Sequence, residues 1–305
     1  MTRSLVVAAC VALLGAIPAA QRQKPAFAPN DLIELDVVAL DRDGRAVTDL
    51  RQDEFRIKED GRLVDVKTFA KVSALGSAQP DDERIVVLLM DDIGVPITGT
   101  SPMQQIAPVV LSPFGPGDEV SVVRLSSRSD EAFGDLKTAR ERIDGYRGGV
   151  QPFSFRDTPE TVLKAIAKIS RQLEGIDHRR KLILCLGLPS VCDVSEPWLG
   201  GTSPIWSAWV DAVSSAARAN AGLYCVDPTG TRGGLNISGS GLVEITGGRI
   251  FAHENSFGRA AEAIWHEAGH YYLLGYWPAA STRELHSIDV SVARKGVKVR
   301  ARQRR

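Results

Sequence analysis

Stretches in which apolar and polar residues alternate mark both ends of the 305-residue chain. Near the N-terminus, residues 31–73 contain "IELDVVAL" and "DEFRIKEDGRLVDVKTFAKV", with turns predicted at 41–44 and 59–61. Near the C-terminus, "IDVSVARKGVKVRAR" alternates in the same way around a turn at 294–296. Alternation with a period of two is typical of antiparallel strands that bury one face. The pattern therefore predicts a small antiparallel β-domain built from the N- and C-terminal strands.

The middle of the chain has a different pattern, in which apolar runs are not interrupted by polar residues. Such runs are typical of parallel strands buried on both faces, and helical stretches between them indicate βαβ units. The predicted strands are 84–92, 119–125, 181–188 and 222–228, the predicted helices are 158–176 and 204–221, and 241–252 reads as a short helix, a Gly-Gly stop and a strand. We therefore predict an α/β domain over 84–270, with a doubly wound, mostly parallel, Rossmann-like sheet.

The first residues indicate export. Arg3 precedes an apolar run over residues 5–17 and then small residues, which is the pattern of a signal peptide over residues 1–20. The run is shorter than the roughly 20 residues that span a bilayer. We expect a periplasmic or extracellular protein with no membrane span, a flexible leader at 21–30, and C-terminal strands at 271–305 that complete the sheet edge and the β-domain.

Net charge and cysteine content add two further expectations. The formal net charge is zero, with 37 basic and 37 acidic residues, so nothing in the balance favours nucleic acid. Removal of the signal peptide leaves Cys185, Cys192 and Cys225, an odd number that leaves at least one thiol free or paired outside the chain. Their sequence contexts favour two small buried side chains, Cys185 and Cys225, and one cysteine in a loop.

Several motifs, in order, resemble a known family. They are "VVALDRDGRAVTDLRQDEFRIKEDGRLVDVKTF", "RIVVLLMDD", "GLVEITGGRIF" and "YYLLGYWP" followed by "IDVSVARKGVKVRAR". The α/β middle resembles a von Willebrand factor type A (VWA) domain, and the whole chain is similar to VWA-related exported proteins of acidobacteria. This resemblance implies a protein-interaction module without catalytic activity.

The same resemblance implies a divalent-cation site at the carboxyl edge of the sheet. VWA domains bind Mg²⁺ or another divalent cation through D-x-S-x-S after the first strand, a Thr from a second loop and an Asp from a third. Here Asp91 and Asp92 follow the first strand, and Thr158 or Thr161 is the candidate for the second loop. No Ser stands at the required spacing, and Gly187-Leu188 replaces the third-loop Asp-Gly. We expect a degenerate site with weak metal binding or none, in which the two Asp residues cap backbone N–H groups.

One short motif points to another kind of chemistry. His266, Glu267 and His270 spell H-E-x-x-H, the zinc-peptidase pattern in which two His bind the metal and Glu activates water. However, Ser256 predicts a helix N-cap and Gly269 a helix stop with a left-handed residue, so that His270 lies beyond the helix and the imidazoles face apart. A zinc peptidase also needs a third protein ligand, and Glu284 and His286, beside the C-terminal hairpin, are the only nearby candidates.

Three hypotheses follow. The leading one is an exported VWA-like adhesion or scaffold module whose partner is an unknown protein or cell-envelope component. Its binding surface would be the carboxyl edge of the parallel sheet, where ligands of open α/β sheets sit. The alternative is a zinc metallopeptidase built on His266, Glu267 and His270. The third is a purely structural envelope protein that has lost its metal site.

Overall fold

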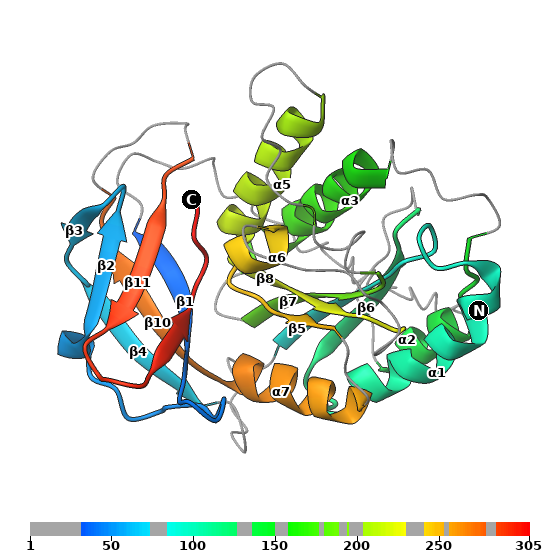
Figure 1. Cartoon of the computed structure of the whole chain (residues 1–305), viewed down its shortest axis with the longest axis horizontal. Coiled ribbons are helices and arrows are strands. Elements are labelled where there is room, and N and C mark those ends of the chain that lie inside the picture. The colour runs from blue at the N-terminus through cyan, green and yellow to red at the C-terminus, as the bar shows by residue number, and fades with distance from the viewer. Residues whose placement is uncertain are drawn as a thin grey trace, which may run out of the picture.

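The structure is a computed structural model. It describes residues 32–73, 84–126, 136–149, 158–176, 180–188, 194, 204–229, 241–252, 256–278 and 285–305. The predicted signal peptide at 1–20 and leader at 21–30 lie outside these residues, and no helix of the described part is long and apolar enough to cross a bilayer. Figure 1 shows antiparallel sheets on one side of the molecule and an α/β layer structure on the other.

A five-stranded parallel sheet forms the centre of the α/β part, with strand order β6-β5-β7-β8-β9. Its strands are β5 (Arg84–Met90), β6 (Glu119–Arg124), β7 (Arg180–Leu186), β8 (Ala221–Val226) and β9 (Ile250–Phe251). The apolar runs became these strands because β5, β7 and β8 are buried along their whole length. The mixed α/β fold class predicted from the sequence is confirmed.

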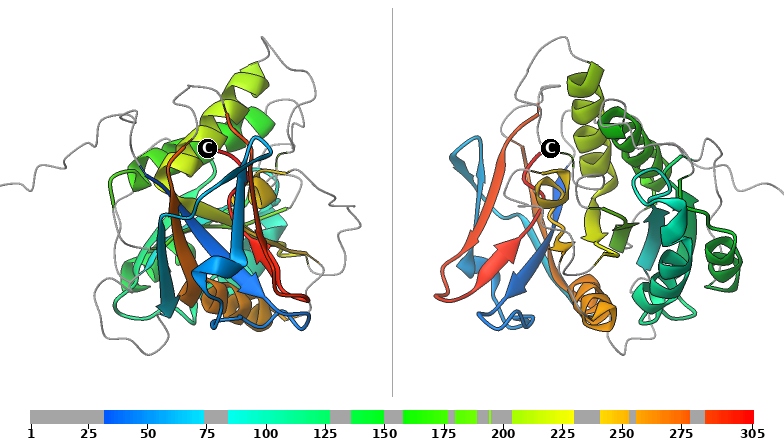
Figure 2. Two further views of the ribbon diagram at one scale, coloured as in Figure 1. Left: turned by 90° about the vertical axis from the view of Figure 1, so that its left-hand side faces the viewer. Right: turned by 45° about the vertical axis from the view of Figure 1, so that its right-hand side comes forward.

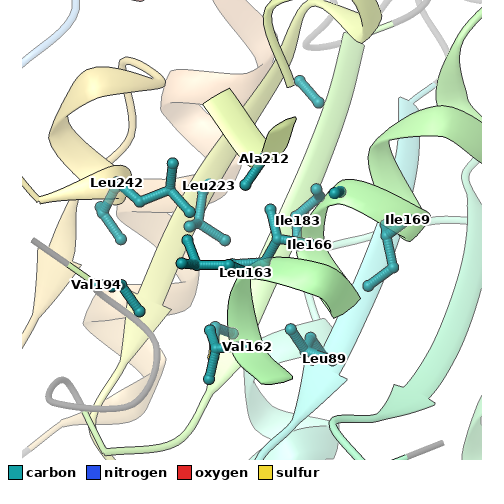
Figure 3. Packing of buried hydrophobic residues seen from close by; sticks show 14 of the residues in the cluster. Leu89, Val162, Leu163, Ile166, Ile169, Ile183, Val194, Ala212, Leu223 and Leu242 are labelled. Carbon is teal, nitrogen blue, oxygen red and sulfur yellow. The ribbon is translucent and has the colours of Figure 1, made fainter. Parts of the chain in front are cut away.

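Helices cover both faces of this sheet. The helices are α1 (Thr100–Leu111), α2 (Leu136–Asp144), α3 (Thr158–Leu173), α5 (Pro204–Ala219), α6 (Leu242–Ile245) and α7 (Phe257–Gly269). Alternate strand residues divide between two cores, one under α3, α5 and α6 and the other under α1, α2 and α7. Figure 3 shows the first of these cores, in which Leu163 and Ile166 of α3 meet Ile183 and Leu223 of the sheet. The sheet is therefore doubly wound.

The two ends of the chain form two antiparallel sheets that pack on each other. One has the order β12-β1-β10-β4 and the other β11-β2-β3. Their strands are β1 (Ile33–Leu40), β2 (Phe55–Glu59), β3 (Arg62–Val64), β4 (Thr68–Ser73), β10 (His270–Tyr276), β11 (Ile288–Val292) and β12 (Lys298–Arg300), and short 3-10 helices lie at Gln52–Glu54 and Ile97–Gly99. Inward side chains such as Leu35, Ile57 and Leu274 form a separate core. The exact domain boundaries predicted from the sequence stay a prediction.

The hairpin predicted at residues 59–61 has the expected turn chemistry. Asp60 and Gly61 connect β2 to β3 with φ values of 48° and 76°. Two successive positive φ values are the signature of a type I′ turn, which the Asp-Gly sequence favours. The Asp60 carboxylate also accepts hydrogen bonds from His286 Nδ1 at 2.7 Å and the Ser287 amide at 2.9 Å. The turn therefore ties the N-terminal hairpin to the C-terminal segment.

The back face of the sheet that contains β1 and β10 packs on the amino-terminal edge of the parallel sheet. Asp36 of β1 forms an ion pair with Arg180 at the start of β7, and it also accepts a hydrogen bond from Asn220 at 2.8 Å. Further along the seam, Gln303 donates its amide to the Ile245 carbonyl at 2.7 Å. The antiparallel sheets thus cover one edge of the parallel sheet, as the turned views in Figure 2 also show.

Cysteine usage differs from the sequence-based expectation. Cys225 is free and buried, as expected. Cys185 is also buried but is disulfide-bonded, so the expectation that it acts only as a small apolar side chain is wrong. Its partner lies outside the described residues.

Gly247 and Gly248, the pair predicted to stop a helix, also allow other backbone segments to approach closely. Gly247 has a φ of 81°, and a Cβ there would lie 2.7 Å from the Ala301 carbonyl carbon. A Cβ on Gly248 would lie 1.6 Å from the Leu223 carbonyl oxygen of β8. Only glycine fits either position, because the contacts are with backbone that cannot rotate away.

We expect Gly248→Ala to lower the free energy of unfolding by about 3 kcal/mol or more, because the methyl group overlaps backbone. The matched control is Gly258→Ala in α7, where an added Cβ meets nothing closer than 3.9 Å. That variant gains up to about 1 kcal/mol from helix propensity. Urea denaturation of both variants tests the difference, and equal stabilities would contradict the close approach at Gly248.

The Asp60 contacts predict an acid-sensitive contribution to stability. Hydrogen bonds from His286 and from the Ser287 amide lower the pKa of Asp60 from 3.8 to about 2. Because the folded-state pKa is below the unfolded one, this contribution is complete above pH 3.8 and is lost as pH falls through about 2.

The matched variant is Asp60→Asn, since Asn tolerates the positive φ of the turn. We expect the wild-type chain to be more stable than this variant near pH 6 and the difference to shrink as the pH falls from 4 to 2. Chemical denaturation at several pH values measures the difference. A gap that is independent of pH would contradict the assigned contacts.

Candidate functional site

The carboxyl edge of β5 carries the first candidate residue. Asp91 follows β5 directly and is fully buried. Its Oδ1 accepts hydrogen bonds from the amides of Ile93 at 3.0 Å and Gly94 at 2.6 Å, and its Oδ2 accepts one from the Leu188 amide at 3.2 Å. Burial raises the pKa of this carboxyl above its usual value, and the backbone N–H groups oppose that shift. Asp91 therefore joins the ends of β5 and β7.

Asp92 has a different neighbour. Its two carboxylate oxygens accept hydrogen bonds from the amide of Ser126 at 2.9 Å and from the Ser126 hydroxyl at 2.5 Å. Ser126 lies two residues after the end of β6, so Asp92 links the carboxyl ends of β5 and β6. Both carboxylates thus accept hydrogen bonds from backbone N–H groups.

The loop at residues 93–99 is fixed from a second side by a segment that the sequence did not single out. The buried Tyr146 donates its hydroxyl hydrogen bond to the Asp91 carbonyl at 2.6 Å. A Cβ on Gly148 would lie 2.3 Å from the Pro96 carbonyl oxygen, and Gly149 donates its amide to the Val95 carbonyl at 2.9 Å. The adjacent glycines Gly148 and Gly149 could have predicted this contact from the sequence, because glycines allow two backbone segments to approach closely.

The described side chains do not fit the octahedral oxygen shell that Mg²⁺ requires. All four oxygens of Asp91 and Asp92 face hydrogen-bond donors, and Ile93 and Val95 stand where the VWA pattern has hydroxyl groups. Thr158 begins α3, but its side chain lies outside the described part of the structure. Within the described residues, no three His, Cys, Asp or Glu side chains gather to hold a metal ion. Metal binding by Asp91, Asp92 and Thr158 stays a prediction.

A further carboxylate at this edge was missed from the sequence. Asp227 follows β8 and is buried. Its Oδ1 accepts hydrogen bonds from the amide of Thr229 at 2.8 Å and from its hydroxyl at 2.7 Å. Asp227 could have been identified from the sequence by its position, since it follows an apolar run as Asp91 does. It too is used to hold its own loop.

The H-E-x-x-H motif lies at the junction of α7 and β10. Ser256 caps the helix by accepting a hydrogen bond from the Arg259 amide, as predicted. The helix ends at Gly269, and His270 is already extended, with φ −132° and ψ 103°. The predicted left-handed residue at Gly269 is wrong, because the chain passes directly from helix to strand.

The expectation that the two imidazoles face apart is also wrong. The rings of His266 and His270 are stacked, with centroids 6.1 Å apart and planes inclined by 26°. His270 is the first residue after the last helical turn, so its side chain still lies over the residue four positions earlier. Its Nδ1 lies 3.3 Å from the His266 carbonyl oxygen, which makes this a hydrogen bond if Nδ1 carries the proton.

Glu267 points away from both histidines. It is 3% exposed and pairs with Arg300 of β12 and with Arg249, whose Nη1 lies 3.5 Å from Oε1. A zinc peptidase needs this carboxylate beside the metal-bound water. The structure instead uses Glu267 to join α7 to the C-terminal strand.

We expect Asp91→Asn to lower the free energy of unfolding by about 1–3 kcal/mol, because an amide N–H would face the Leu188 amide with no acceptor between them. Asp92→Asn should cost less, since the Ser126 hydroxyl can rotate and accept from the new amide. Thermal melts of both variants with and without Mg²⁺ measure this. A stabilisation by Mg²⁺ that vanishes in either variant would instead establish a VWA-type metal site.

No protein-family model and no curated protein matches the sequence. Among solved structures, an aerotolerance-related membrane protein from Bacteroides fragilis shares 11% identity at a TM-score of 0.41, covering 61% of this chain and 98% of its own. The protein BatB from Bacteroides thetaiotaomicron shares 12% identity at 0.37, covering 60% and 96%. The manganese-loaded TRAP protein from Plasmodium vivax shares 10% identity at 0.39, covering 80% and 97%. With identities and TM-scores this low, these likenesses carry no argument about function.

Proposed function

We propose that this chain is a non-enzymatic protein-interaction module that binds a protein or cell-envelope component through the carboxyl edge of its parallel sheet. Ligands of open α/β sheets sit at that edge. The opposite, amino-terminal edge is occupied by the antiparallel sheets through contacts such as Asp36 with Arg180. The carboxyl edge is therefore the one that the β-domain leaves accessible.

The observation that carries this proposal is the fixed loop at residues 93–99. Asp91 holds its start and Gly149 holds its middle, so the loop keeps its shape before any partner arrives. Within this loop, Ile97 begins the short 3-10 helix and is 47% exposed. A large apolar side chain on a rigid loop is well suited to protein binding, because little conformational entropy is lost on association.

The chemistry around the two candidate sites supports a binding function without catalysis. At the carboxyl edge, Asp91, Asp92 and Asp227 are each used to hold a loop. At the end of α7, Glu267 is held by Arg300 and Arg249 and cannot activate water beside the histidines. The peptidase alternative thus lacks its base, and the proposed module needs no metal.

The finer assignments belong to the same proposal. The N-terminal pattern supports export to the periplasm or the extracellular space, and the ordered motifs support membership of the VWA-related family of exported acidobacterial proteins. The doubly wound sheet, with Asp91 directly after β5, agrees with that family's expected layout. The degenerate loop after β5 agrees with a member whose binding is independent of metal.

We expect Ile97→Asp to abolish partner binding while leaving the fold intact, because Ile97 is exposed and a charge there opposes an apolar contact. The matched control is Leu63→Asp, since Leu63 of β3 is 64% exposed but lies in the β-domain. The tagged mature chain and both variants are used as baits in an envelope extract of the source organism. A partner captured by the wild type and Leu63→Asp is then purified and titrated against all three.

Equal affinity of the purified partner for the Ile97→Asp variant would overturn the proposed edge. Binding that disappears with EDTA would overturn its metal independence. Peptide hydrolysis that requires zinc and is lost in Glu267→Gln would overturn the non-enzymatic assignment in favour of the peptidase. Absence of any specific partner would favour the purely structural protein.

A further inference from the structure

The stacked histidines at the end of α7 form a feature that the proposed function does not use. His266 is exposed and His270 is half-buried, and both rings face the surface at the point where α7 passes into β10. Figure 1 shows this junction, where the orange helix continues into the strand. We propose that the two imidazoles form a surface binding site for a divalent transition-metal ion, namely Cu²⁺, Ni²⁺ or Zn²⁺.

The arrangement of His270 favours a metal ligand. Its Nδ1 lies 3.3 Å from the His266 carbonyl oxygen. A proton on Nδ1 is held by that carbonyl, which leaves the lone pair on Nε2. Metal-ligating histidines almost always use their second nitrogen in this way, because the hydrogen bond fixes both the tautomer and the ring orientation.

The ring of His266 is positioned from two sides. Trp265 meets it edge-on, with centroids 5.4 Å apart, and the His270 ring stacks on it. Within the described residues, neither nitrogen of the His266 ring has a hydrogen-bonding partner. One imidazole nitrogen is therefore open to a ligand at each ring.

The distance between the rings is suited to one shared ion. A Zn–N bond of about 2.0–2.1 Å places two nitrogens of a tetrahedral site roughly 3.3 Å apart. The ring centroids lie 6.1 Å apart and the planes are inclined by only 26°. Binding of one shared ion therefore requires the two side chains to rotate until one nitrogen of each ring points at the same place.

The neighbouring acid does not complete a catalytic site. Glu267 pairs with Arg300 and Arg249 on the other side of the helix end. With two protein nitrogens, the remaining coordination positions are filled by water. Imidazole suits Cu²⁺, Ni²⁺ and Zn²⁺, and the Irving–Williams series places Cu²⁺ first among them. The site therefore differs from a zinc peptidase both in ligand number and in lacking a general base.

Isothermal titration of the mature chain with CuCl₂, NiCl₂ and ZnCl₂ tests this proposal. We expect one ion per chain, with Cu²⁺ bound most tightly. His266→Ala should weaken binding at least about ten-fold, because a chelate becomes a single imidazole contact. His270→Gln should do the same, and a glutamine side chain there keeps a polar group at the start of β10.

The matched control is Glu262→Gln, which changes an exposed residue one turn before His266 on the same helix. Its metal affinity should equal that of the wild type, and thermal melts confirm that all variants are folded. Absence of binding in the wild type would overturn the proposal. So would unchanged affinity in both folded histidine variants, since the ion would then bind elsewhere. Partner binding through Ile97 is measured without metal, so the two proposals fail independently.

Discussion

The buried ion pair between Asp36 and Arg180 is the contact on which the arrangement of the two halves depends. Both side chains are less than a tenth exposed, at 7% and 6%, and they join β1 to the first residue of β7. The Arg180 guanidinium also lies over the Tyr271 ring, 5.0 Å from its centroid. Removing one member of a buried pair costs about 3–5 kcal/mol, because the other charge is left without compensation. The pair therefore fixes which face of the β-domain meets the parallel sheet.

Other contacts along the same seam involve the C-terminal segment. Arg302 donates to the Ala217 carbonyl at the end of α5, and the Gln303 amide reaches the Ile245 carbonyl of α6. Gly247 lets the chain approach Ala301 more closely than any other residue would allow. These backbone contacts fix the C-terminal segment against the α/β part. Because the whole seam lies at the amino-terminal edge of the parallel sheet, the antiparallel strands do not cover the carboxyl ends of β5 and β8.

Periodicity predicted the parts of this fold that are determined by burial. Uninterrupted apolar runs form β5, β7 and β8, because these strands are buried on both faces. Alternating segments form the antiparallel strands, which bury one face. The helix α1 was missed because Pro102 and Pro108 lie inside its apolar pattern. The sequence predicted that Asp91 and Asp92 cap backbone N–H groups, but their distant partners Leu188 and Ser126 could not be predicted, because these depend on how loops far apart in the sequence meet. The same is true of Tyr146, which lies 55 residues from the carbonyl that it contacts.

The H-E-x-x-H segment shows why a motif's residues have to be considered one at a time. His266 and Glu267 are adjacent, so on a helix their side chains diverge by about 100°. The side chain of His266 lies at the surface beside His270. The side chain of Glu267 lies in the seam between the sheets, where a carboxylate has to be paired in order to be buried. Arg300 and Arg249 provide that pairing, so Glu267 contributes to the domain interface. The same helix end thus presents two imidazoles while the acid of the motif is held by arginines elsewhere.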